Sequence, residues 1–257
     1  MSAGPRRAEL SQHFLRKGAT PARLVHGTTI SRSDLVVEIG AGRGALTLPL
    51  ARRAHRVIAV EIDEALVADL RDRIDERVEL VCGDFLQTQL PAAPYKAFGN
   101  VPFSRTTDIV SKLVHAPNPP SDAWLIIQRE AAQRFCGPPY MRESLWSLRL
   151  KPAWHVEIVD RLRRVDFDPP PSVESVLLWL HRRDRPLLDD SERHLYEQLI
   201  ERAFTSNLSL SRTTGPWLSK LQLRRLANDL RFGYDGAPSM LGFEQWLGLV
   251  RFIRRMR

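Results

Sequence analysis

Apolar runs alternate with amphipathic stretches through the first two thirds of this 257-residue chain, and this alternation restricts the fold more than any other feature. The runs are almost continuously apolar, which is typical of parallel strands that are buried on both faces. We therefore expect an α/β, doubly wound domain with helices on both faces of a parallel sheet. The expected strands are 35–40, 56–61, 78–81, 97–99, 124–128, 156–159 and 175–180, and the expected helices are 45–54, 64–74, 107–115 and 129–136.

The pattern changes after Leu180, where a charged segment at 181–186 is followed only by helical periodicity. Helices are expected at 191–204, 216–230 and 242–256, with Ser191 as the N-cap of the first. We expect two domains, an α/β domain at 1–184 and a small all-helical domain at 185–257.

The charge of the chain favours a polyanionic partner. The net charge is +8, and residues 1–33 alone carry six Lys or Arg against one acid. Residues 185–257 carry 12 Lys or Arg against 8 acids. These clusters predict a basic N-terminal arm and a basic helical domain, both suited to a nucleic acid.

The composition also bears on whether the chain is a membrane, secreted, metal-binding or disulfide-containing protein. No apolar run reaches the roughly 18 residues of a membrane span, and residues 1–7 have no apolar core of a signal peptide. Cys82 and Cys136 are the only cysteines, and Cys82 stands in an apolar run, where it is expected to pack as a small hydrophobe. We expect a cytoplasmic monomer with no membrane contact, no metal site and no disulfide.

A glycine-rich turn follows the first expected strand. Gly40 and Gly42 let the backbone turn sharply and approach a ligand closely. Glu61 closes the second strand, where a carboxylate can accept hydrogen bonds from ribose hydroxyls. Asp84 follows the third strand and can accept from an adenine amine. Gly40-x-Gly42-x-x-Ala45 also fits a dinucleotide fingerprint, so the turn and Glu61 alone leave both NAD and S-adenosylmethionine open.

The tetrapeptide Asn100-Val101-Pro102-Phe103 follows the fourth expected strand. Pro102 keeps Val101 out of the helical region, so the Val101 carbonyl can point the same way as the Asn100 amide oxygen. Two such acceptors can hold an aromatic amine and stabilise positive charge as it develops on nitrogen. Phe103 would supply a stacking face for an extruded base.

The ordered set of motifs resembles the rRNA adenine-N6 methyltransferase family, and within it the Erm-type enzymes. The resemblance covers nearly the whole chain. It rests on Ser11-Gln12-His13-Phe14-Leu15, the glycine turn, Glu61-Ile62-Asp63, Gly83-Asp84, Gly99 to Phe103, Thr106-Thr107-Asp108-Ile109, Phe167 to Ser175, and Gly242-Phe243-Glu244-Gln245-Trp246.

The resemblance implies that the α/β domain is a Rossmann-like methyltransferase domain and that S-adenosylmethionine is the cofactor. It also implies that one adenine in the peptidyl-transferase region of 23S rRNA is the substrate. Methylation there would confer resistance to macrolide, lincosamide and streptogramin B antibiotics. It also implies a set of cofactor contacts and of residues that serve the target base. The cofactor set is His13, Leu15, Gly40, Gly42, Glu61, Asp84 and Asn100, and the catalytic set is Asn100, Val101, Pro102 and Phe103.

Two residues depart from the family pattern, because most members have Asn at the position of His13 and Tyr at that of Phe103. Phe103 keeps the stacking face and loses only a hydroxyl, whereas His13 changes one polar contact. We expect in-line attack of the amine on the sulfonium methyl, without a histidine or glutamate beside Asn100 as general base.

Three alternatives remain open from the sequence. The first is a housekeeping 16S rRNA adenine dimethyltransferase, which has the same chemistry and a different substrate. The second is a non-catalytic RNA-binding relative or transcription partner that retains the cofactor. The third is an NAD-dependent oxidoreductase, which leaves Asp84 and the tetrapeptide unexplained.

Overall fold

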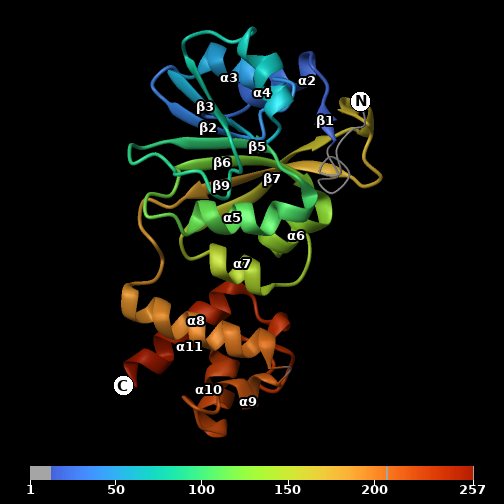
Figure 1. Cartoon of the computed structure of the whole chain (residues 1–257). Coiled ribbons are helices and arrows are strands. Elements are labelled where there is room, and N and C mark those ends of the chain that lie inside the picture. The colour runs from blue at the N-terminus through green and yellow to red at the C-terminus, as the bar shows by residue number, and fades with distance from the viewer. Residues whose placement is uncertain (1–12, 207, 257) are drawn as a thin grey trace. The chain divides into compact units, whose positions relative to one another are not determined.

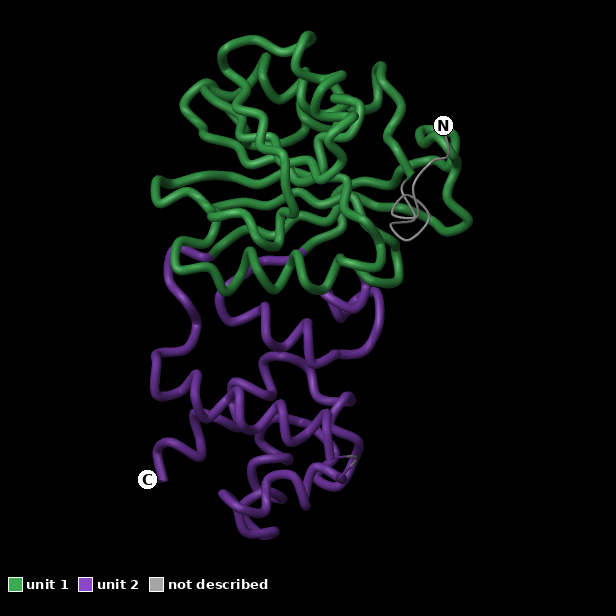
Figure 2. The backbone as a smooth tube through the Cα atoms, in the orientation of Figure 1, with its two compact units in different colours: residues 1–132, 157–182 green, residues 133–156, 183–257 purple. Residues whose placement is uncertain are grey.

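The computed structural model describes residues 13–206 and 208–256, which form two compact units (Figures 1 and 2). The described part of unit 1 is 13–132 with 157–182, and that of unit 2 is 133–156 with 183–256. Unit 1 carries the sheet, and unit 2 consists mainly of helices.

A seven-stranded sheet forms the centre of unit 1, in the order β4-β3-β2-β5-β6-β9-β7. All seven expected strands are present. They are β2 (Leu35–Ile39), β3 (Arg56–Glu61), β4 (Val78–Cys82), β5 (Lys96–Asn100), β6 (Asp122–Gln128), β7 (Trp154–Leu162) and β9 (Ser175–Arg182). The expected α/β, Rossmann-like fold class is therefore confirmed.

The pairing of β9 corrects the expectation of a wholly parallel sheet. The pairs β2–β3, β2–β5, β3–β4 and β5–β6 are parallel, but β6 and β9 are antiparallel. A parallel neighbour requires a crossover connection, usually a helix. β9 is not entered from a crossover helix, because only a short 3₁₀ turn and a two-residue strand separate it from β7, the strand before it in the chain.

Helices flank the sheet as its alternating sequence predicts (Figure 1). Asp63 caps one of them through bonds from the N–H groups of Ala65 and Leu66. The helix at Ala19–His26 was not expected, because Gly18 and Pro21 are residues that normally disfavour a helix. Pro21 is tolerated here because it lies in the first turn. The helices are α2 (Ala19–His26), α3 (Thr47–Arg53), α4 (Glu64–Arg71), α5 (Thr106–Val114) and α6 (Arg129–Cys136).

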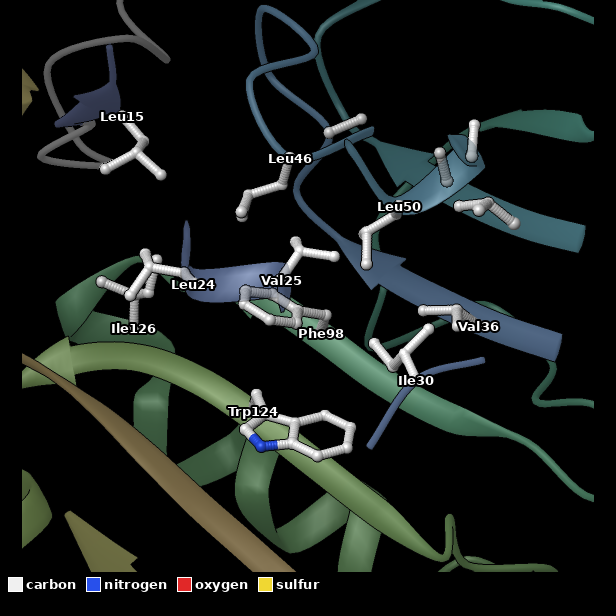
Figure 3. Packing of buried hydrophobic residues seen from close by; sticks show 14 of the residues in the cluster. Leu15, Leu24, Val25, Ile30, Val36, Leu46, Leu50, Phe98, Trp124 and Ile126 are labelled. Carbon is white, nitrogen blue, oxygen red and sulfur yellow. The ribbon is translucent and has the colours of Figure 1, made fainter. Parts of the chain in front are cut away.

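The unexpected helix α2 contributes to the hydrophobic core of unit 1. Figure 3 shows Leu24 and Val25 of α2 near Phe98 of β5, with Trp124 of β6 close by. The rings of Phe98 and Trp124 stack with centroids 6.4 Å apart. All four side chains are at most 2% exposed, so α2 is held by burial.

A second unexpected element joins the chain near its start to a distant segment. The strand β1 (Phe14–Leu15) pairs antiparallel with β8 (Phe167–Asp168). Strands of two residues are too short for any periodicity to predict them. This small sheet places residues 13–15 at the edge of the functional site described below.

The helices of unit 2 pack around Tyr196 and Trp246, which are 1% and 0% exposed. The first long helix is capped by Asp189 rather than by Ser191. The helix expected at 216–230 begins only at Lys220, and a short helix at Leu210–Thr214 was not expected. The elements are α7 (Leu145–Leu150), α8 (Asp190–Thr205), α9 (Leu210–Thr214), α10 (Lys220–Leu230) and α11 (Phe243–Arg255).

The division between the units differs from the expected boundary between residues 184 and 185. The chain divides at Arg182 and Arg183, and unit 2 also takes in residues 133–156. The reason is that α7 packs on α8, where the Tyr196 hydroxyl donates to the Leu148 carbonyl over 2.9 Å. Such a long-range contact leaves no local signal in the sequence.

Three further expectations concern cysteines, metals and membranes. Both cysteines are free thiols, and Cys82 is exposed rather than packed in the core as expected, because it lies at the end of β4. Within 13–206 and 208–256, no group of His, Cys, Asp and Glu is arranged to hold a metal ion. Among the helices of those same residues, none is long and apolar enough to cross a membrane.

Candidate active site

The strands β2 to β5 end at one edge of the sheet, around a cavity that is open to solvent. Because β2 lies between β3 and β5, the strand order reverses there, and ligands of such sheets bind outside this reversal. Nearly all of the predicted site residues line the cavity, namely His13, Gly40, Gly42, Glu61, Asp84, Asn100, Val101, Pro102 and Phe103.

Leu15 is the one predicted residue that does not line the cavity. Its side chain is 5% exposed and belongs to the hydrophobic core, while its backbone pairs with Phe167. Ser11 and Gln12 of the same motif lie outside the described residues.

The glycine turn between β2 and α3 adopts backbone conformations that favour glycine. Gly40 and Gly42 have φ of 76° and 53°. A Cβ at Gly42 would lie 3.2 Å from the ring of Phe14, which itself lines the cavity. The turn therefore leaves a cradle that a side chain would fill.

Glu61 is held in one orientation by two backbone donors. The Gly42 N–H donates to one carboxylate oxygen over 2.7 Å, and the Asp63 N–H donates to the other over 2.9 Å. Glu61 is only 4% exposed, so these bonds offset the cost of burying its charge. Each oxygen keeps a lone pair for a ligand.

The bond from Gly42 also bears on the dinucleotide alternative. A Rossmann turn binds the pyrophosphate of NAD through free backbone N–H groups at the glycine loop. Here the Gly42 N–H is already bonded to Glu61. This arrangement disfavours a dinucleotide.

Asp84 and Ile62 form the wall beyond Glu61. One Asp84 oxygen accepts from the Leu86 N–H over 2.9 Å, and the other lies 3.9 Å from the Arg105 guanidinium. Ile62 is 49% exposed although it lines the cavity. Two carboxylates beside an exposed aliphatic side chain fit a cationic ligand with a flat ring, hydroxyls and an amine.

Asn100 is the last residue of β5. In the sheet, β3 and β2 separate β5 from β4, the strand that precedes Asp84. The side-chain Nδ2 of Asn100 donates to the backbone carbonyl of His13 over 2.8 Å. The His13 Nδ1 lies 2.9 Å from the Pro169 carbonyl, and its ring lies 5.8 Å from that of Phe103. His13 thus contacts Asn100 through its backbone carbonyl, and the expectation that no histidine serves Asn100 as a general base stays a prediction.

Glu38 of β2 is a buried carboxyl that the sequence motifs did not single out. It is 0% exposed, and the polar residue that acts on it is Thr47, whose hydroxyl and backbone N–H partly offset the effect of burial. Burial raises the pKa of Glu38 to about 8, and the charge of nearby Glu61 acts in the same direction. Glu38 precedes the glycine turn in the sequence and does not line the cavity.

Sequence reasoning missed several other residues of the cavity wall. Most of them stand one to three residues after a predicted site residue or motif, so adjacency was the available signal. They are Phe14, Ile62, Gly83 and Ile109, which stand within the quoted motifs but were given no role, and Ile39, Val60, Phe85, Leu86 and Arg105, which stand beside them.

Comparison with known proteins places the chain in a family. A family model described as ribosomal RNA adenine dimethylase matches residues 5–214. The chain belongs to this family. The protein is therefore an S-adenosylmethionine-dependent rRNA adenine methyltransferase, which confirms the expected enzyme class and cofactor.

The relatives are of two kinds. An rRNA adenine N-6-methyltransferase of Streptomyces fradiae is 34% identical over 262 residues, which cover 98% of this chain and 80% of the relative. A dimethyladenosine transferase of Candida glabrata is 32% identical over 193 residues, which cover 72% of this chain and 60% of the relative.

Among the solved structures that match, one is a 23S rRNA methyltransferase and another is a dimethyladenosine transferase. The 23S rRNA methyltransferase ErmE matches with a TM-score of 0.86 and 29% identity, over 94% of this chain and 99% of ErmE. A dimethyladenosine transferase from Plasmodium falciparum matches with a TM-score of 0.75 and 21% identity, over 95% and 98% of the two chains, and shares the fold. The Erm-type resemblance is thereby confirmed.

Proposed function

We propose that this enzyme methylates the N6 amine of one adenine in the peptidyl-transferase region of 23S rRNA, and so confers resistance to macrolide, lincosamide and streptogramin B antibiotics. One observation carries the chemistry: Asn100, Val101, Pro102 and Phe103 line the same cavity as Glu61 and Asp84. The likeness to ErmE over 94% of the chain supports the large-subunit substrate.

The carboxylate side of the cavity is assigned to the cofactor. S-adenosylmethionine supplies an electrophilic methyl group when it is bound. Glu61 would accept from the ribose hydroxyls, Asp84 from the adenine amine, and Ile62 would cover the adenine ring. Gly40 and Gly42 would leave room for the rest of the ligand, as the space at Gly42 supports.

The Asn100 side is assigned to the target base. The Asn100 Nδ2 is already bonded to His13, so its Oδ1 is left as an acceptor for the target amine. The Val101 carbonyl would accept the second N–H of the same amine. These two bonds strengthen as positive charge develops on nitrogen, which is the kind of interaction that raises turnover. Phe103 would stack on the extruded ring.

No general base is assigned. The methylated nitrogen is strongly acidic while it carries the extra proton, so it can lose that proton to water. The one imidazole nearby has Nδ1 within hydrogen-bond distance of the Pro169 carbonyl. Positioning and the two acceptors would supply most of the acceleration.

The helical domain at 185–257, with the basic N-terminal arm, is assigned to RNA binding. Residues 185–257 carry an excess of four positive charges, and phosphate contacts from them would make RNA binding weaken as salt rises. We propose in addition that the enzyme works as a monomer in the cytoplasm, where ribosomal RNA is processed.

Substitution of Asn100 tests the proposed chemistry. Asn100→Ala should lower the rate of methyl transfer to 23S rRNA by at least about 100-fold, the usual effect of losing one preorganised polar group. Cofactor affinity, measured by calorimetry, should stay within about 3-fold, because the lost acceptor serves the target amine. The exposed Glu64→Ala, outside the domain assigned to RNA binding, is the control. Near-normal turnover of Asn100→Ala would refute the assigned role.

A housekeeping 16S rRNA dimethyltransferase is the second candidate, supported by the relatives named dimethyladenosine transferase. Their alignments cover 72% of this chain, against 95–98% for three named rRNA adenine N-6-methyltransferases. Competition between naked 23S rRNA and immature small ribosomal subunits for labelled methyl groups separates the two. A non-catalytic relative would label neither.

A further inference from the structure

His13 connects three parts of unit 1 that are far apart in the sequence. Its backbone carbonyl accepts from Asn100 Nδ2 over 2.8 Å, and its Nδ1 lies 2.9 Å from the Pro169 carbonyl. Its ring lies against that of Phe103, with centroids 5.8 Å apart and planes tilted by 35°. One residue thus contacts both side chains assigned to the target base.

The backbone of His13 determines which way the Asn100 amide points. A carbonyl can only accept, so the Asn100 side chain must turn its NH₂ group toward His13. A flipped amide would bring two acceptors together and lose the bond. Oδ1 is therefore held as an acceptor toward the cavity.

The ring of His13 determines which part of Phe103 is open. A centroid distance of 5.8 Å lies within the range of direct contact between two rings, so no third ring fits between them. An adenine can stack only on the remaining surface of Phe103. His13 therefore acts as a support for that ring rather than as the other half of a sandwich.

The bond to Pro169 fixes the imidazole itself. A backbone carbonyl accepts, so Nδ1 carries a proton and donates to Pro169. The neighbouring Asp168 is held by β1–β8 pairing and by Arg43, whose guanidinium lies 3.1 Å from its carboxylate. The support behind Phe103 is therefore anchored to a second segment of the chain.

We propose that His13 is a positioning residue for the target base, which acts through Phe103 and the Asn100 amide and not as a cofactor ligand or a general base. This inference rests on the proposed function and names one more residue of the same site. It predicts that the ring of His13 increases the rate of methyl transfer to RNA.

Two substitutions at His13 separate the effect of its ring from the effect of its nitrogens. His13→Asn keeps a short N–H donor for Pro169 and the backbone carbonyl for Asn100, but removes the ring behind Phe103. His13→Phe keeps a ring and the carbonyl, but removes both nitrogens. The control is His55→Asn, because His55 is exposed and precedes β3, at the opposite end of that strand from Glu61.

The assay is methyl transfer to an oligonucleotide of the 23S target region, with cofactor affinity measured by calorimetry. His13→Asn should lower kcat about 5- to 10-fold, the usual range for a lost aromatic contact. His13→Phe should stay within about 3-fold of the wild type. Cofactor Kd should change by less than about 3-fold in both, which also reports that each variant is folded.

Fluorescence gives a second readout. With 2-aminopurine at the target position, stacking on Phe103 should quench the wild-type complex, and His13→Asn should be brighter than His13→Phe. Equal brightness of the two complexes would contradict support of Phe103 by the ring.

Each other outcome overturns the proposal in a distinct way. If His13→Phe is as inactive as His13→Asn, or less active, the imidazole nitrogens matter and a base or hydrogen-bonding role replaces the ring. If cofactor Kd rises in parallel with the loss of kcat, His13 is a cofactor ligand. If His13→Asn turns over normally, the ring has no positioning role. If the wild-type protein transfers no methyl group to the oligonucleotide, the proposed function itself is refuted.

Discussion

The two ends of the cavity are built in different ways. At the carboxylate end, Glu61 and Asp84 are held by backbone N–H groups 2 to 19 residues away in the sequence. At the amide end, Asn100 is held by His13, 87 residues away, and His13 contacts Pro169, 156 residues away.

This difference indicates how each end depends on the rest of the fold. The carboxylate end needs only β2, β3 and β4 with their turns. The amide end needs β5, the segment around β1 and the segment after β8 together. We expect substitutions at the carboxylate end to change cofactor affinity, and those at the amide end to change turnover.

The largest expected effect concerns Glu38 of β2, the strand that leads into the glycine turn at the carboxylate end, and is measured as the stability of the fold. The raised pKa of Glu38, about 8 against 4.5 in the unfolded chain, means that the folded protein holds this proton more tightly. Its contribution to stability is full below pH 4.5 and is lost as the pH rises toward 8. The free energy of unfolding should therefore lose on the order of 3 kcal/mol between pH 5 and 8 through this group.

Glu38→Gln removes the titration while keeping the shape of the side chain. Urea unfolding at pH 5, 6, 7 and 8 should show a flatter pH dependence for Glu38→Gln than for the wild type. Parallel curves for the two proteins would show that Glu38 is not protonated in the fold.

The next effect concerns cofactor affinity. Glu61→Gln has only one acceptor oxygen, so its NH₂ group must face the N–H of Gly42 or of Asp63 and leave a buried donor unsatisfied. We expect cofactor Kd to rise about 10- to 100-fold, with turnover at saturating cofactor nearly unchanged. The exposed neighbour Glu64→Ala is the control. A loss of turnover without a change in Kd would break the division between the two ends.

The smallest effect of the series concerns stacking at the amide end. Phe103→Leu should lower turnover about 10-fold, because base–aromatic stacking contributes about 1–3 kcal/mol. Phe103→Tyr keeps the ring and should remain within about 2-fold of the wild type. Steady-state kinetics with 23S rRNA measures both. Equal rates for the leucine and tyrosine variants would mean that the ring face is not used.

The same contrast explains what the sequence could predict. Gly40, Glu61, Asp84 and Asn100 each follow an apolar strand, and parallel strands end at one edge, so a list of strand ends already predicts the cavity. The Asn100–His13 and His13–Pro169 bonds have no such pattern, because they join segments whose proximity depends on the whole fold.

Some errors in the predicted fold have the same cause. The antiparallel β9, the exposure of Cys82 and the grouping of 133–156 with the helical unit all depend on which neighbour an element meets. The side chain of Leu15 packs in the core, so its predicted contact with the cofactor would have to come from its backbone and stays a prediction. Local patterns identify strands and helices more readily than they identify partners.

The most direct test of the central claim is mass analysis of the nucleosides from 23S rRNA after incubation with the enzyme and labelled S-adenosylmethionine. We predict label in N6-methylated adenosine at a single position of 23S rRNA, and almost none with Asn100→Ala. Label that appears only in small-subunit rRNA, on another atom, or equally with Asn100→Ala would contradict the account.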